Sequence, residues 1–128
     1  MKKLTVLLMG LVISGALMAQ AKPKDWKELA AFHDVMSETF HPAEEGKLDP
    51  IKSRSGEMVT AAKDWKKSTP PAEFNKPEIQ SSLDKLVKGS KELDKMVKNN
   101  ASDADLTKKL TDLHDVFHEI VGLCKDAH

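Results

Sequence analysis

The stretch LTKKLTDLHDVFHEIVGLC, residues 106–124, decides the fold class of this chain. Its apolar side chains recur every three or four residues, the spacing of one face of an α-helix. They are Leu106, Leu110, Leu113, Phe117, Val121 and Cys124. Ser102, followed three residues later by Asp105, supplies a start signal for this helix. The stretch therefore predicts an amphipathic helix over roughly 103–125 whose apolar stripe packs against other helices.

Three upstream segments show the same periodicity. The first is predicted to run from about Asp25, as N-cap, to His41, where the following proline should end it. The second opens at Asp49, and the third covers roughly 77–98. Their predicted inward-facing residues are Trp26, Leu29, Phe32, His33, Met36 and Phe40, then Ile51, Met58, Ala61, Ala62 and Trp65, then Ile79, Leu83, Leu86, Val87, Leu93, Met96 and Val97. No segment alternates as a strand would, so we predict an all-α, antiparallel up-down-up-down four-helix bundle.

The first twenty-one residues have the pattern of a secretory signal peptide. Lys2 and Lys3 form a charged start, residues 4–18 form an apolar run too short to span a bilayer, and Ala19-Gln20-Ala21 is an A-x-A cleavage site. We predict a signal peptide over 1–21, one bundle domain over 22–128, a periplasmic location and no membrane span in the mature chain. That mature chain would carry 18 Lys and Arg against 20 Asp and Glu. This balance gives nucleic-acid binding no electrostatic support.

Histidines occur only in the first and last of the four predicted helices and at the C-terminus: they are His33, His41, His114, His118 and His128. His114 and His118 are four residues apart, so they share a helix face with Cβ atoms about 5–6 Å apart. At about 100° per residue, this pair lies about 40° and 80° from the centre of its apolar stripe, and His33 and His41 lie about 40° and 120° from theirs. All four histidines lie on the same side of their apolar stripes, a position called the shoulder of the stripe here. In two antiparallel neighbouring helices, shoulders on the same side face each other.

The level of the two shoulders can be estimated as well. If the first and last helices are antiparallel neighbours, facing residue numbers add to roughly 151, which places His33 opposite His118. His33, His114 and His118 then form a three-imidazole set. His41, with Glu44 or Glu45 from the loop that follows, would supply a fourth ligand or a second site. Such donors suit zinc, copper, nickel or iron.

Several of these residues also have an ordinary structural interpretation. A histidine on a helix shoulder is commonly just a half-buried polar residue. Met36 and Met58 fit as core fillers, or as thioether ligands if the ion is copper. Cys124 is the only cysteine, which excludes an intramolecular disulfide and fits a small buried hydrophobe. For the same reason CKDAH at 124–128 is not a C-x-x-C-H haem attachment motif.

A second interpretation comes from three features between residues 58 and 121: AAKDWKKSTPP at 61–71, a proline-opened third helix, and VFHE at 116–119. In these features the chain resembles the cytochrome b562 family and, more loosely, the cytochrome c′ bundles. The resemblance implies haem b held non-covalently between the first and last helices. The implied axial ligands are His118 and His33, with Met36 as the fallback, and the implied role is electron transfer.

Three functions are therefore in play. The first is an exported, non-enzymatic bundle that holds a transition-metal ion between its first and last helices for sensing, carriage or buffering. The second is a b-type cytochrome, and the third is a periplasmic interaction or chaperone-like protein without a metal. An enzyme is not expected, because no nucleophile–base pair or carboxylate dyad is apparent. The metal, the protein partner, homodimer formation and an intermolecular disulfide through Cys124 stay open.

Overall fold

The computed structural model describes residues 22–125, which form four α-helices and two short 3-10 turns, with no strand among them. The helices are α2 (Lys27–Glu44), α3 (Asp49–Lys67), α4 (Pro77–Lys98) and α5 (Asp103–Lys125). The turn η1 (Pro23–Asp25) precedes α2, and η2 (Ala72–Phe74) lies between α3 and α4. The all-α prediction is confirmed for this part of the chain. The predicted signal peptide and His128 lie outside the described residues.

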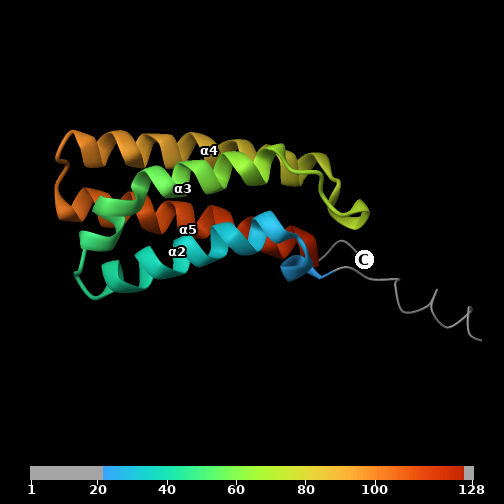
Figure 1. Cartoon of the computed structure of the whole chain (residues 1–128), viewed down its shortest axis with the longest axis horizontal. Coiled ribbons are helices and arrows are strands. Elements are labelled where there is room, and N and C mark those ends of the chain that lie inside the picture. Colours follow the sequence, from blue (N-terminus) through green and yellow to red (C-terminus); the bar gives the residue numbers. More distant parts are fainter. Residues whose placement is uncertain (1–21, 126–128) are drawn as a thin grey trace, which may run out of the picture.

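The four helices lie side by side along one long axis (Figure 1). The α2–α3 and α4–α5 connections lie at one end of the molecule, and the α3–α4 connection with η2 lies at the other. Each helix packs against the next one in the chain, and α2 also packs against α5. The backbones of α2 and α5 come close at fewer positions than those of the other neighbouring pairs. The seam between the first and the last helix is therefore the most open one.

An aromatic cluster closes the end of the bundle at which α2 begins. Trp26 meets Trp65 edge-on at 5.7 Å between ring centroids and stacks on Phe74 at 6.1 Å. The indole Nε1 of Trp26 donates a hydrogen bond to Ser68 Oγ at 2.8 Å. Each aromatic pair adds about 0.5–1.5 kcal/mol beyond the burial of its area. The cluster thus fixes the start of α2 against the α3–α4 connection.

The predicted apolar stripes form one continuous core. Ala61, Val87, Met96, Val97 and Val121 are only partly buried at its edge, and His33 is exposed. The stripes missed several buried residues, among them Val35, Thr39, Ser55, Ser82, Ser90 and Ile120. Three of the small polar ones are buried with a hydrogen-bond partner: Thr39 Oγ1 donates to Val35 O at 2.9 Å, Ser55 Oγ to Asp94 Oδ1 at 2.7 Å, and Ser82 Oγ to Glu119 Oε2 at 2.6 Å. A pattern of apolar residues does not reveal such pairings.

The predicted bounds of the first helix are wrong at both ends. Asp25 caps η1 instead of α2, because its carboxylate accepts the Lys22 N–H at 2.9 Å. At the other end, Pro42 lies inside α2 instead of ending it. A proline in the last turn removes one donor, while its own carbonyl accepts the N–H groups of Glu45 and Lys47, both at 2.9 Å. Gly46, at φ +82°, then makes the left-handed turn that leaves the helix.

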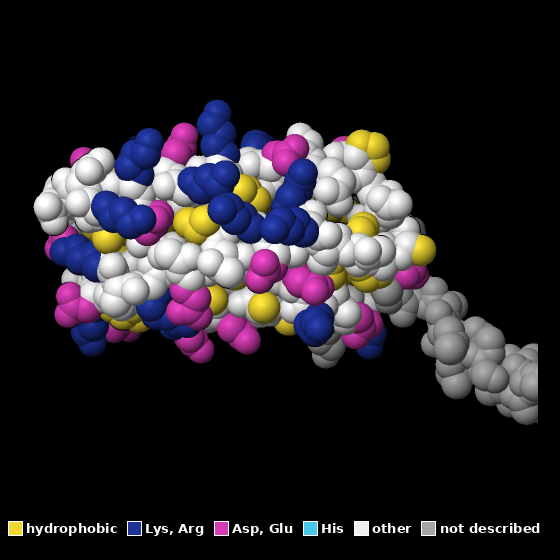
Figure 2. Space-filling model, turned by 45° about the horizontal axis from the view of Figure 1, so that its top comes forward, with side chains coloured by type: hydrophobic (Ala, Val, Ile, Leu, Met, Phe, Trp, Pro, Cys, Tyr) yellow, Lys and Arg dark blue, Asp and Glu magenta, His cyan; other side chains and the backbone are white. Residues whose placement is uncertain are grey.

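The starts of the last two helices were predicted correctly, at Pro77 and Asp103. Ser102 Oγ accepts the N–H of Asp105 at 3.1 Å, as the sequence indicated. Asp49, by contrast, is the first residue of α3, and Leu48 occupies its N-cap position. Lys and Arg side chains gather over the surface of α3 and α4 (Figure 2), where ion pairs such as Lys66–Asp84 at 2.7 Å tie neighbouring helices together. No helix of the described residues is long and apolar enough to cross a membrane.

Gly89 allows α4 to approach α5 closely, which a pair of glycine substitutions can test. A Cβ at Gly89 would lie 2.6 Å from Leu113 Cδ2, whereas one at Gly56 would meet nothing closer than 4.0 Å. Alanine is favoured over glycine inside a helix by about 1 kcal/mol, but overpacking a core costs about 1–3 kcal/mol. In urea titrations we expect Gly89→Ala to lower the free energy of unfolding by roughly 1 kcal/mol, and Gly56→Ala to raise it by a similar amount. Equal gains in both variants would contradict the close packing at Gly89.

Candidate metal centre

The four histidines predicted as ligands all border one hollow between α2 and α5. This α2–α5 hollow has a volume of about 250 Å³. Its lining residues are His33, Met36, Ser37, Phe40, His41, His114, Phe117 and His118. The sequence-based placement of two imidazole-bearing shoulders on one seam therefore agrees with the structure.

His114 and His118 form the closest pair of potential ligands in the hollow. Their Nε2 atoms lie 3.2 Å apart, and their rings meet edge-on with centroids 4.4 Å apart. The ring of Phe40, from α2, stacks on His114 at 4.0 Å and 12°. Because this stacking restricts the His114 ring, the Nε2 atom that faces His118 is held in place from the opposite helix.

The separation of the two nitrogens suits a shared ion. Zinc–imidazole bonds are about 2.0–2.1 Å long, so two nitrogens 3.2 Å apart would subtend an angle of about 100° at one metal ion. That angle lies between the tetrahedral and square-planar values. Without a metal, the same two atoms can share one proton, with one Nε2–H donating to the other Nε2. The separation of the two nitrogens is thus one that a single bound ion can span.

His33 enters the hollow from the opposite helix. Its ring stacks on Phe117 at 5.6 Å, and Phe117 meets His118 edge-on at 5.7 Å. These contacts agree with the predicted level, at which facing residue numbers add to roughly 151. The His33 side chain is 57% exposed, and its Nδ1 lies 4.0 Å from Asp34 Oδ1. His33 is therefore freer to turn within the open seam than His114, whose ring stacks more closely on its partner, at 4.0 Å.

His41 lies at the rim of the hollow, 67% exposed, with Nδ1 3.3 Å from Glu44 Oε1. Glu45 pairs instead with Lys47, at 3.5 Å. Of the two carboxylates that the sequence offered, Glu44 is thus the one beside His41. Within residues 22–125, no three or more His, Cys, Asp or Glu side chains are grouped closely enough to form a metal site as they stand. The preformed part is the His114–His118 pair, and a further donor has to turn toward it.

Electrostatics favour the neutral form of His114. Burial lowers the pKa of this imidazole from its ordinary value of 6.5, and the neighbouring His118 and the more distant His41 lower it further. Asp115 and Glu44 act in the opposite direction, but more weakly than burial. Only a neutral imidazole nitrogen binds a metal. The environment therefore keeps His114 ready to bind at neutral pH.

Haem fits this arrangement less well than an ion does. A second hollow, of about 300 Å³, adjoins the first and shares His33, Phe117 and His118 with it. Each hollow alone is at or below the usual lower limit of a cofactor pocket, about 300 Å³. Phe117 contacts both implied axial ligands and is buried in the core. A haem bound between His33 and His118 would therefore have to lie against this ring.

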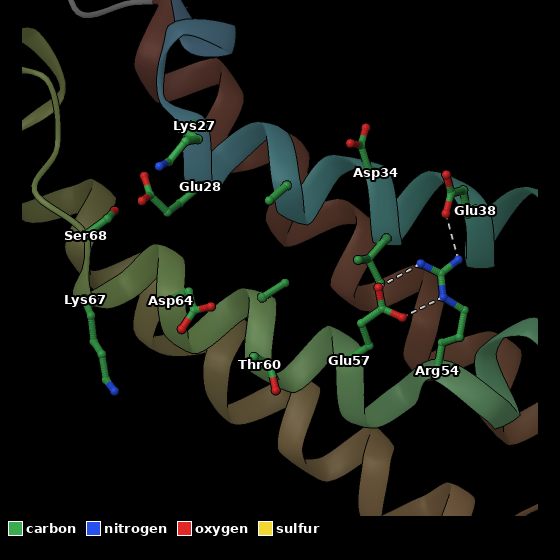
Figure 3. Close-up of a pocket in the computed structure, with 13 residues that line it drawn as sticks. Lys27, Glu28, Asp34, Glu38, Arg54, Glu57, Thr60, Asp64, Lys67 and Ser68 are labelled. Atoms are coloured by element: carbon green, nitrogen blue, oxygen red, sulfur yellow. Dashed lines mark hydrogen bonds and ion pairs between the residues drawn. The ribbon is translucent and has the colours of Figure 1, made fainter.

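A larger hollow lies between α2 and α3, and no histidine lines it (Figure 3). At one end of it, Arg54 donates to Glu38 Oε1 at 2.7 Å and to both oxygens of Glu57, at 2.8 and 2.9 Å. These three charged side chains therefore form ion pairs with one another. Cys124 is also excluded as a ligand of the α2–α5 hollow, because it does not border it and burial raises the pKa of its thiol to about 11. A buried, protonated thiol is inert in the folded chain.

The sequence reasoning missed the role of the aromatic rings. Phe40 and Phe117 were assigned only to the core, yet both also contact the imidazoles. One signal in the sequence marks the same seam: the tripeptide HDV occurs at 33–35 and again at 114–116. The two copies lie on the two helices that border the hollow.

Comparison of the chain with models of protein families, with curated proteins and with solved structures finds no match. The resemblance to cytochrome b562 therefore stays a prediction from the residues, and function has to be argued from the α2–α5 hollow.

The lowered pKa of His114 predicts a loss of stability in mild acid. Well above pH 6.5 the imidazole is neutral in both the folded and the unfolded chain. As the pH falls below 6.5, the unfolded chain binds the proton first, so the free energy of unfolding falls and then levels off below the folded pKa. We expect urea titrations at a series of pH values without metal to show this fall. His114→Gln should make it shallower, and an unchanged slope in that variant would contradict the assignment.

Proposed function

We propose that the protein is an exported, non-enzymatic metal-binding bundle that holds a transition-metal ion between α2 and α5. The observation that carries this proposal is the His114–His118 pair, whose Nε2 atoms lie 3.2 Å apart in a hollow also bordered by His33 and His41. The two imidazoles of α5 would bind the ion, and an imidazole from α2 would complete its coordination. His118 and His41 are exposed, so an ion can enter from solvent.

The proposed setting is the periplasm, reached through a signal peptide over residues 1–21 that is removed. The proposed topology is up-down-up-down, and it is supported by connections that alternate between the two ends of the helix array (Figure 1). In such an arrangement the ion binds reversibly at the open seam. This suits sensing, carriage or buffering of the metal better than a permanent structural site, which is usually closed by four protein ligands.

Metal-dependent stabilisation tests the proposal on the mature chain. An ion that binds only the folded protein, at 100 times its Kd, raises the free energy of unfolding by about 2.7 kcal/mol. We expect zinc, nickel or copper to give a stabilisation of this order in thermal unfolding, and His118→Ala or His114→Ala to abolish it. His33→Ala and His41→Ala should reduce it. His128→Ala, the same change at a histidine with no proposed role, should leave it intact.

Two results would overturn this proposal: no stabilisation by any of the three metals, or full stabilisation of the His118→Ala variant. The first result would favour the third interpretation, an interaction protein whose histidines bind no metal, whereas the second would mean that the metal binds without His118. The variants should be compared with the parent chain without metal first, so that any loss of folding is separated from loss of binding.

A b-type cytochrome is the second candidate, supported by the two adjoining hollows that both reach His33 and His118. Titration of the mature chain with haem separates it from the first candidate. A saturable Soret band that His118→Ala removes would establish the cytochrome function. If the absorbance stays that of free haem while zinc or copper still stabilises the chain, the ion-binding proposal stands alone.

A further inference from the structure

We infer that the ion held in the α2–α5 hollow is Cu(I) and that Met36 is one of its ligands. This inference rests on the proposed metal-binding function and adds the identity of the metal and a sulfur ligand. Met36 is 1% exposed, yet it borders the hollow together with the His114–His118 pair. Among the residues that line the hollow, it is the only one that carries sulfur.

The position of Met36 on α2 brings it to the same hollow as the ligand pair. Residues three and four apart on a helix share a face, so Met36 is flanked by His33 and Phe40. Phe40 stacks on His114 at 4.0 Å, and His33 stacks on Phe117 at 5.6 Å. Met36 therefore stands on α2 between the two residues whose rings contact α5, and it borders the same hollow as the histidines.

The donor set of the hollow is soft and uncharged. Its lining provides four imidazoles, one thioether and one hydroxyl, but no carboxylate. The carboxylates of Glu44 and Asp34 lie beside His41 and His33, at 3.3 and 4.0 Å, but do not line the hollow. Thioether sulfur selects Cu(I) among the biological metals, whereas hard ions such as calcium and magnesium require oxygen ligands. The usual protein ligands of zinc are imidazole, thiolate and carboxylate, so a thioether adds little to the affinity for zinc.

The net charge of the occupied site also favours Cu(I). The aromatic rings of Phe40 and Phe117 form part of the wall and exclude water from the side of the hollow on which Met36 is buried. With neutral ligands, a bound Cu(I) leaves one positive charge in this site, whereas Cu(II) or zinc leaves two. Removing a charge from water without a compensating opposite charge is costly, and the cost rises with the charge. A singly charged, weakly hydrated ion is therefore preferred.

Replacement of the sulfur tests the inference. Leucine has nearly the volume and shape of methionine, so Met36→Leu keeps the packing while it removes the proposed ligand. Met58→Leu is the matched control, because Met58 is equally buried but does not border the α2–α5 hollow. Affinity for Cu(I) is measured without oxygen by competition with a chromophoric Cu(I) chelator. Affinity for zinc is measured on the same proteins by calorimetry.

We expect Met36→Leu to weaken Cu(I) binding at least tenfold, an effect of about 1.4 kcal/mol, while zinc binding stays within about twofold. Met58→Leu should change neither affinity. X-ray absorption of the Cu(I) complex gives an independent readout: a sulfur neighbour of copper should be present in the parent chain and in Met58→Leu, and absent in Met36→Leu.

The outcomes separate this inference from the proposed function. If Cu(I) binds through His118 but Met36→Leu behaves like Met58→Leu and no sulfur neighbour is seen, the inference is overturned and the metal-binding function stands. An equal loss of zinc and Cu(I) affinity in Met36→Leu also overturns it, because the effect is then one of packing. If neither ion binds the parent chain in a His118-dependent way, the proposed function itself fails.

Discussion

The packing of Phe117 connects the core of the bundle to the imidazoles on its surface. Its ring meets Phe32 and Trp65 on the inner side, at 5.8 and 5.9 Å, and His33 and His118 on the outer side, at 5.6 and 5.7 Å. Trp65 in turn contacts Trp26, at the start of α2. A continuous set of ring contacts therefore runs from the end of the bundle to the candidate site, so the positions of His33 and His118 depend on how the core is packed.

The two halves of the site have different degrees of preorganisation. The His114–His118 pair is set by the geometry of one helix and by stacking on Phe40, so it costs little to order when an ion arrives. His33 and His41 are more than half exposed and have to lose side-chain freedom on binding. The pair can thus account for most of the affinity, while the α2 histidines determine how fully the ion is enclosed and how readily it leaves.

The sequence predicts the features that depend on a single helix better than those that depend on two. The spacing of His114 and His118 fixes a shared face, and the apolar stripes fix which shoulder His33 occupies. The distance from His33 to the pair was beyond that reasoning, because it is set by Phe40 and Phe117, rings that the pattern assigned only to the core. The ends of α2 were mispredicted for a similar reason, since they depend on backbone hydrogen bonds at Lys22 and Pro42 that no periodicity records.

The place of the site in the chain also bears on its function. The pairs α2–α3, α3–α4 and α4–α5 are each joined by a connection, whereas α2 and α5 meet only through their side chains. The spacing of this last pair can therefore change without straining a loop. It is also the pair whose backbones are least closely packed. An ion bound between α2 and α5 would add a link where the chain itself provides none, so binding there should be coupled to the closure of the bundle.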